Sequence, residues 1–159
     1  MTGVSAFSSP LVMQIRTVSI SVAAPRDPVF NYLANIENLP GWSAEFCEHL
    51  ELRQGRWWAY TPQGEAMVEL EVCAAAGTLD FHVGPAPDQM ALFPLRVLPL
   101  GPRRTMVTYT FVQQGTVSDE TYEAQYASLL TVMRGLIRRF GGGELHAFEP
   151  TPLALAGRN

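Results

Sequence analysis

The strongest constraint on the fold is a long amphipathic segment late in the chain, SDETYEAQYASLLTVMRGLIRRFGGG, residues 118–143. Its apolar residues recur at positions i, i+3 and i+4, the spacing of one face of an α-helix. Ser118 can serve as the N-cap and Gly141 as the C-terminal stop. A helix of about twenty residues is roughly 30 Å long, so its apolar stripe needs a large partner surface. The stripe is formed by Tyr122, Tyr126, Leu129, Leu130, Met133, Leu136, Ile137 and Phe140.

The middle of the chain predicts that partner surface, because short runs of alternating residues are separated by turn signals. Connections such as Gln54-Gly55 favour an antiparallel meander. A first strand is expected in LVMQIRTVSISVAA, followed by two short helices in PRDPVFNYLANIENLPGW. In that second stretch, Asp27 before Pro28 reads as an N-cap, and Pro40-Gly41 reads as a break. The meander strands are expected at 46–54, 56–62, 65–74, 77–83, 89–98 and 104–114.

Together these elements predict an α+β fold. A curved, seven-stranded antiparallel sheet would wrap around the long C-terminal helix, with the two short helices placed after the first strand. We expect a single domain over residues 11–141, preceded by a loose segment at 1–10 and followed by an irregular tail at 142–159. If the sheet holds the helix only at its ends, the space between them is a pocket.

Composition excludes several classes of function. The 159 residues carry a net charge of −4 and no basic run, so nucleic acid is not an expected partner. No apolar stretch is long enough to predict a membrane span. The segment MTGVSAFSSP lacks the features of a signal peptide, so a cytoplasmic protein is expected. His49, His82 and His146 lack metal-ligand spacing, and neither a metal nor another cofactor is expected.

Two stretches carry a resemblance to a known superfamily. ISVAAPRDPVFNYLANIENLPGWS resembles the entry to the SRPBCC superfamily, which has the START-like helix-grip fold. TLDFHV, FPLRVLPLG and TMVTYTFVQQGTVSDETYEAQ resemble its polyketide cyclase/dehydrase-like members. The resemblance implies a deep cavity for a hydrophobic or aromatic small molecule between sheet and long helix. Where relatives read Asp-His, this chain reads Asp80-Phe81-His82, which moves the imidazole to the other face of the strand.

Asp80 and His82 are the candidate catalytic residues. They share one face of the TLDFHV strand, and Leu79, Phe81 and Val83 share the other. If the apolar face looks at the helix, Asp80 and His82 face water or a neighbouring strand, where Arg96 could pair with Asp80. If they instead reach the pocket, they could donate or accept a proton. Glu69 and Glu71 pose the same choice, with the outer face favoured.

Aromatic residues are the stronger indication of a ligand site. Tyr109 and Phe111 share a strand face with Val107, so they should point at the helix, where Tyr122 and Tyr126 lie one turn apart. An inward tyrosine needs a partner for its hydroxyl, and a ligand or water can supply it. The predicted ligand-binding residues are Trp42, Trp58, Tyr60, Phe81, Phe93, Arg96, Tyr109, Phe111, Tyr122, Tyr126, Leu130 and Met133.

Three functions fit this sequence. The first is binding of a small hydrophobic or aromatic molecule without turnover. The second is an enzyme of the cyclase/dehydratase type acting on a polyketide-like substrate, and the third is a protein-binding module of the co-chaperone kind. An ionisable group in the pocket would favour the enzyme, and a filled core with an exposed apolar patch would favour the protein binder. A homodimer is left open.

Overall fold

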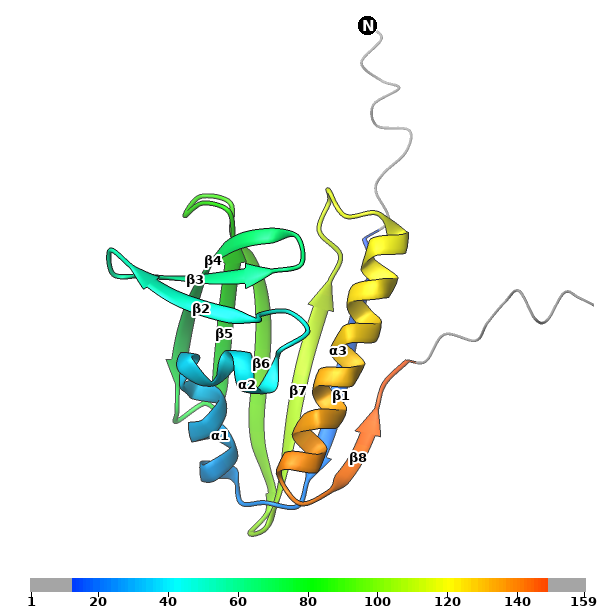
Figure 1. Ribbon diagram of the computed structural model, residues 1–159. Helices are drawn as coiled ribbons and strands as arrows, with labels where there is room; N and C mark the ends of the chain where they lie inside the picture. The colour runs from blue at the N-terminus through cyan, green and yellow to red at the C-terminus, as the bar shows by residue number, and fades with distance from the viewer. Residues whose placement is uncertain (1–12, 149–159) are drawn as a thin grey trace, which may run out of the picture.

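The computed structural model describes residues 13–148, which form an α+β structure (Figure 1). The expectation for residues 1–10 lies outside this range, as does the end of the expected tail. The elements in chain order are β1 (Ile15–Val22), α1 (Arg26–Ala34), the 3-10 turn η2 (Ile36–Asn38), α2 (Leu39–Trp42), β2 (His49–Arg53), β3 (Arg56–Thr61), β4 (Gly64–Cys73), β5 (Thr78–Gly84), β6 (Ala91–Gly101), β7 (Arg104–Val112), α3 (Asp119–Arg139) and β8 (Gly143–His146).

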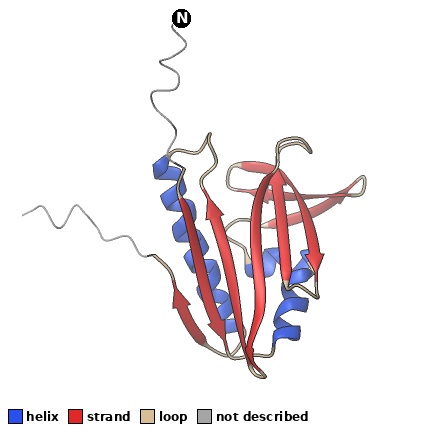
Figure 2. Ribbon diagram, turned by 180° about the vertical axis from the view of Figure 1, so that it is seen from behind, coloured by secondary structure: helices blue, strands red, loops and turns tan. Residues whose placement is uncertain are grey.

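One antiparallel sheet contains all the described strands, in the order β2-β3-β4-β5-β6-β7-β1-β8. The helices lie on one side of it, as the views from front and back show (Figures 1 and 2). The β2–β3 hairpin crosses over the upper part of the sheet at a steep angle to β5, β6 and β7 (Figure 1). The sheet is therefore strongly curved around the helical layer, and the predicted helix-grip architecture is confirmed.

The sheet has eight strands in the described residues, where the sequence predicted seven. The extra strand, β8, pairs antiparallel with β1, with Val22 opposite Gly143 and Ser19 opposite His146. The chain turns back after α3 through glycines with positive φ at 141–143, a conformation that costs glycine little. The prediction of an irregular tail was therefore wrong for residues 143–146, because four residues with little β-propensity are held by pairing with an edge strand.

The ends of the short helices also differ from the prediction. Helix α1 has Pro25 as its N-cap, so Asp27 lies within the first turn and does not cap it. Pro40 does not break α2 but occupies its first turn. In both helices the proline falls where backbone N–H groups have no intrahelical acceptor, so its missing N–H costs nothing there. The caps of α3 match the prediction, since the Ser118 side chain accepts from Thr121 N–H and Gly141, with φ of 91°, follows the last turn.

The core lies between the inner face of the sheet and the apolar stripe of α3. Leu79 and Phe81 are buried there, which confirms the predicted inner face of β5. On α3, Tyr122 and Met133 are fully buried, and Tyr126 and Leu136 are nearly so. Helix α3 contacts β1 and β8 at one end of the sheet, whereas α1 contacts β6 and β7. The sheet thus grips the long helix along one edge only.

The central position of Met133 predicts a large loss of stability on truncation. We expect Met133→Ala to lower the free energy of unfolding by about 2–5 kcal/mol, because it removes buried apolar volume and leaves a cavity. Urea unfolding followed by circular dichroism measures this change. Thr131→Ala, on the exposed side of the same helix, should change it by less than about 0.5 kcal/mol. Equal effects of the two substitutions would contradict this placement of the core.

Candidate functional site: an aromatic cavity between sheet and helix

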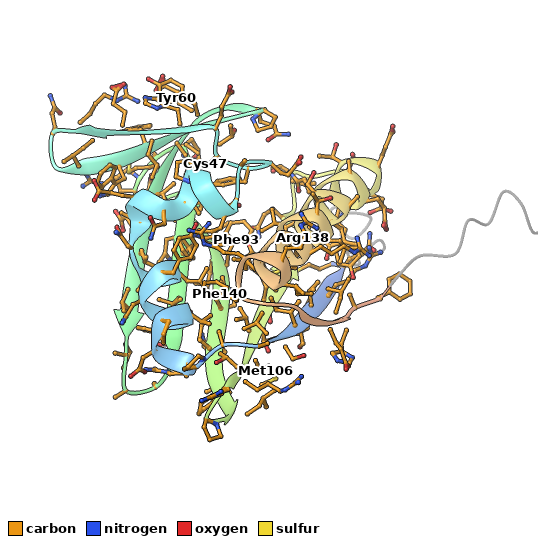
Figure 3. The ribbon with its side chains drawn as sticks, turned by 60° about the horizontal axis from the view of Figure 1, so that its bottom comes forward. Cys47, Tyr60, Phe93, Met106, Arg138 and Phe140 are labelled. Atoms are coloured by element: carbon orange, nitrogen blue, oxygen red, sulfur yellow. The ribbon has the colours of Figure 1, made fainter. Side chains whose placement is uncertain are left out.

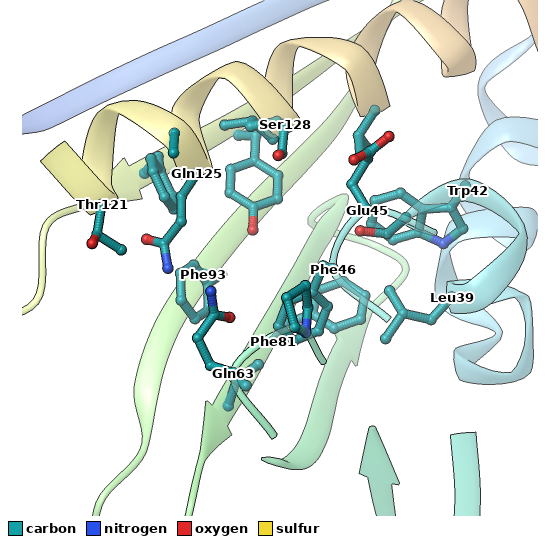
Figure 4. Close-up of a pocket in the computed structure, with 18 of the residues that line it drawn as sticks. Leu39, Trp42, Glu45, Phe46, Gln63, Phe81, Phe93, Thr121, Gln125 and Ser128 are labelled. Atoms are coloured by element: carbon teal, nitrogen blue, oxygen red, sulfur yellow. The ribbon is translucent and has the colours of Figure 1, made fainter. Parts of the chain in front are cut away.

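A cavity of about 500 Å³ lies between the curved sheet, α2 and the N-terminal half of α3 (Figure 4). This volume falls within the range of sites that hold drug-sized molecules. The cavity is lined by Leu39, Trp42, Ser43, Glu45, Phe46, Pro62, Gln63, Phe81, Val83, Phe93, Tyr109, Phe111, Glu120, Thr121, Ala124, Gln125, Ser128, Leu129 and Val132.

The cavity has a closed apolar floor and an open polar mouth. Leu39, Trp42, Phe81, Phe111 and Leu129 are all buried and form the floor. The exposed lining residues come from three separate segments, the loop after α2, the β3–β4 turn and the first turns of α3. These three segments frame the entrance, so a ligand could enter there without unfolding of the core.

One face of α3 explains why space remains beneath it. The residues of this face recur at helical spacing, and most are small or polar: Thr121, Ala124, Gln125, Ser128, Leu129 and Val132. The apolar stripe that anchors α3 lies next to it, and the two stripes meet at Leu129. Because Ala124 and Ser128 are short, they cannot fill the gap to the sheet. Sequence reasoning missed this face because small and polar residues beside an apolar stripe resemble a solvent-exposed surface.

Aromatic rings form a large part of the apolar wall of the cavity. Trp42 meets Phe81 edge to face with centroids 5.9 Å apart, and Phe93 lies 6.4 Å from Tyr109 and 6.3 Å from Phe111. These spacings are typical of favourable aromatic pairs. The rings come from α2, β5, β6 and β7, four elements brought together by the curvature of the sheet. The wall is therefore a continuous apolar surface suited to flat molecules.

Two polar groups in this wall have no hydrogen-bond partner among the described residues. The indole Nε1 of Trp42 is buried and unpaired. The Tyr109 hydroxyl also forms no hydrogen bond in that part of the chain. The Tyr109 ring is only half-buried because it faces the cavity, yet protein atoms crowd around it, and this burial raises the pKa of the phenol. Both groups are hydrogen-bond donors at neutral pH. The indole N–H is buried without an acceptor, which is costly, whereas the Tyr109 hydroxyl is accessible from the cavity.

Two amide side chains face each other across the cavity. Gln63 comes from the β3–β4 turn and Gln125 from α3, and their amide groups point toward one another (Figure 4). The turn is held by two bonds, from the Thr61 hydroxyl to Gly64 O at 2.6 Å and from Gln63 N–H to the Thr61 hydroxyl at 3.2 Å. The position of Gln63 at the mouth is therefore fixed by its own turn. Sequence reasoning gave no indication of either glutamine.

The structure brings five of the predicted ligand-binding residues to the cavity and leaves the others elsewhere. Those in the wall are Trp42, Phe81, Phe93, Tyr109 and Phe111. Tyr60 lies on the β2–β3 hairpin, away from Phe93 and the interior (Figure 3), and its hydroxyl donates to Glu51 at 3.0 Å. The Arg53 guanidinium lies over the ring of Trp58, 4.7 Å from its centroid. Leu130 and Met133 pack in the core beside the cavity.

Contrary to the sequence-based prediction, Tyr122 and Tyr126 do not border the cavity. The Tyr122 hydroxyl donates to Phe111 O at 2.7 Å, and the Tyr126 hydroxyl donates to Phe148 O at 2.5 Å. The Arg16 guanidinium lies over both rings, at 5.2 Å and 4.6 Å from their centroids. The two tyrosines belong to the stripe that fastens α3 to β1, so their hydroxyls already have partners and the cavity lies on the adjacent helix face.

The structure also keeps Asp80 and His82 away from the cavity. Both lie on the outer face of β5, opposite Phe81, where Asp80 pairs with Arg96 at 3.0 Å and His82 contacts Glu71 at 2.7 Å. Arg96 is drawn to the same outer face, so it does not line the cavity either. These three side chains form cross-strand pairs at the surface, where ion pairs contribute little to stability. Proton transfer to a molecule in the cavity is out of their reach.

The described residues contain neither a metal-binding cluster nor a membrane-spanning helix. In residues 13–148, no three His, Cys, Asp or Glu side chains gather in a way that could hold a metal ion. In the same range, no helix is long and apolar enough to cross a membrane. Cys47 is buried, Cys73 is exposed, and both are free thiols.

Solved structures of three proteins show the fold class. An aromatase/cyclase, Zhui, from Streptomyces sp. R1128 has a TM-score of 0.60 at 17% identity, over 80% of this chain and 90% of that one. A START superfamily protein from Mycobacterium smegmatis has a TM-score of 0.57 at 15% identity, over 80% and 96%. Norcoclaurine synthase from Thalictrum has a TM-score of 0.60 at 12% identity, over 84% and 97%.

The chain therefore has a START-like helix-grip fold. At these identities the likeness concerns the fold alone. The sequence matches no protein-family model and no curated protein.

The different surroundings of the tyrosines predict different effects of removing a hydroxyl. Tyr122→Phe should lower the free energy of unfolding by about 0.5–1.5 kcal/mol, because it deletes a buried hydrogen bond. Tyr109→Phe should change the free energy of unfolding by less than about 0.5 kcal/mol, because the Tyr109 hydroxyl forms no hydrogen bond with the described residues. Urea unfolding of both variants makes the comparison. If Tyr109→Phe is the more damaging change, the cavity assignment of that hydroxyl is wrong.

Proposed function

We propose that this protein binds a small hydrophobic or aromatic molecule in the cavity between the sheet and α3. The observation that carries the proposal is the combination of an aromatic wall with an unpaired donor, the Tyr109 hydroxyl. A flat ligand with an oxygen or nitrogen acceptor would cover the rings and accept from that hydroxyl. A ligand pocket usually has an apolar wall and a few convergent polar groups.

The cost of the empty space supports the same proposal. A well-packed core excludes voids, and larger side chains at Ala124 or Ser128 would fill this one and bury more apolar surface. Proteins keep such unfavourable arrangements mainly where function needs them. The protein-binding alternative depended on a filled core, whereas the described core leaves about 500 Å³ open.

Turnover of a polyketide-like substrate is the second candidate function. It is favoured by Tyr109, whose phenol faces the cavity; because burial raises its pKa, the phenol stays protonated and can donate a hydrogen bond to a carbonyl oxygen. The fold is shared with a protein described as an aromatase/cyclase. Binding and turnover use the same cavity, so one assay serves both: a bound candidate substrate that is recovered with altered mass indicates the enzyme.

A fluorescence titration with N-phenyl-1-naphthylamine, a neutral aromatic probe, tests the binding proposal. We expect saturable enhancement with the unmodified protein. Ala124→Phe should weaken binding by about tenfold or more, a loss of roughly 1.4 kcal/mol or more, because the new ring occupies the cavity. Ala127→Phe is the matched control, since Ala127 is an exposed residue one turn along α3 that does not line the cavity.

The proposal fails if the probe does not bind, or if Ala124→Phe and Ala127→Phe bind it equally well. Circular dichroism of both variants before titration establishes that each is folded, so a loss of binding reports on the cavity.

A further inference from the structure

We propose that the cavity selects hydrophobic molecules that carry a positive charge, such as aromatic amines, over neutral and anionic ones of the same shape. This inference rests on the proposed binding function and specifies the class of ligand. Its basis is the charge of the lining and the arrangement of the aromatic rings.

All the charged residues that line the cavity are acidic. They are Glu45, in the loop after α2, and Glu120, in the first turn of α3. The chain contains no lysine, so its eleven basic residues are all arginines, and no arginine of residues 13–148 lines the cavity. An anionic ligand would therefore meet only like charge at the mouth, and an ammonium group could pair with either carboxylate.

Arg16 and Arg96 are paired with carboxylates that do not line the cavity. Arg16 of β1 binds Glu123 at 2.5 Å, and Arg96 binds Asp80 on the outer face of β5. In contrast, the Glu45 and Glu120 side chains have neither an ion pair nor a hydrogen bond within the described part of the chain. Two carboxylates at one mouth, each without a counter-charge, leave a net negative potential there.

The backbone holds Glu45 at the mouth. The N–H groups of Phe46 and Cys47 both donate to Ser43 O, at 3.0 Å and 2.8 Å, which closes a tight turn around Glu45. The Cys47 side chain is fully buried beneath that turn. The backbone of Glu45 is thus held in a fixed loop, so the loop itself need not become ordered when a ligand binds the carboxylate.

The aromatic wall favours the same charge. A cation near the face of an aromatic ring is attracted by its quadrupole, and the effect is strongest where water is excluded. Six aromatic rings line this cavity, those of Trp42, Phe46, Phe81, Phe93, Tyr109 and Phe111. An ammonium group at the mouth would keep contact with water and with Glu45, while the apolar body of the molecule would cover the rings. No comparable attraction exists for a carboxylate.

Three naphthalene probes of nearly the same size test the inference: 2-(1-naphthyl)ethylamine, 2-(1-naphthyl)ethanol and 1-naphthylacetate. Isothermal titration calorimetry at pH 7 and low salt concentration gives their dissociation constants. We expect the amine to bind about three- to tenfold more tightly than the alcohol, as for one or two partly solvated charge pairs. The acetate should bind more weakly than the alcohol. Added salt should reduce the preference for the amine.

A double variant identifies the carboxylates responsible. Glu45→Gln with Glu120→Gln should bring the amine-to-alcohol ratio to within about twofold of one. The control is Glu37→Gln with Glu48→Gln. It makes the same change in net charge at two exposed carboxylates that do not line the cavity. The control variant should keep the preference for the amine.

The outcomes separate this inference from the proposed function. If none of the three probes binds, the proposed function itself fails. If the alcohol or the acetate binds as tightly as the amine, the cavity binds hydrophobic molecules but does not select positive charge. The inference is also overturned if the control variant loses the preference as fully as the cavity variant, since net charge alone would then explain it.

Discussion

Tyr122 of α3 lies flat against Phe111 of β7, with ring centroids 4.8 Å apart and planes inclined by 11°. Its hydroxyl reaches past the ring to Phe111 O, so one residue contributes both a stacked contact and a buried hydrogen bond. Arg16 of β1 covers the same tyrosine and pairs with Glu123 on α3. This contact sets the distance between α3 and the sheet at β1 and β7, and the geometry of the cavity depends on that distance.

Away from this contact, the rest of the sheet curves away from α3. Beyond Phe111 the inner face continues to Phe93 and Phe81, and the face of α3 that lines the cavity includes the short side chains of Ala124 and Ser128. The α2 segment and the β3–β4 turn close the space from the other side. The cavity therefore follows from one tight edge contact combined with strong curvature. The residues that leave the gap unfilled provide the space for a ligand, and the charged residues at its mouth affect which ligand binds.

Sequence periodicity was enough to predict the fold. The stripe of α3 and the alternation in β5 placed Met133 and Phe81 in the core, and short turns predicted the meander. Strand β8 could not be predicted, because pairing with β1 and not local propensity makes GELH a strand. Pro40 was mistaken for a break because its position relative to a helix start is not visible in composition alone.

The site was predicted less well, for a related physical reason. Residues that pack and residues that line a cavity are both apolar, so the aromatic wall was found, whereas Tyr122 and Tyr126 were wrongly included in it. The distinguishing residues are those beside the packing stripe, such as Ala124 and Ser128, and short side chains have no pattern of their own. Glu45 was missed because only the loop conformation brings it to the mouth.

The measurement that tests the central claim most directly is a two-dimensional ¹H–¹⁵N NMR titration with 2-(1-naphthyl)ethanol, following the indole N–H signals. The chain has three tryptophans. Only Trp42 lines the cavity, while Trp57 and Trp58 lie on β3 outside it. The structure predicts that the Trp42 signal shifts progressively and saturates while the other two stay in place. Saturable binding that shifts Trp57 or Trp58 and leaves Trp42 unchanged would contradict the account.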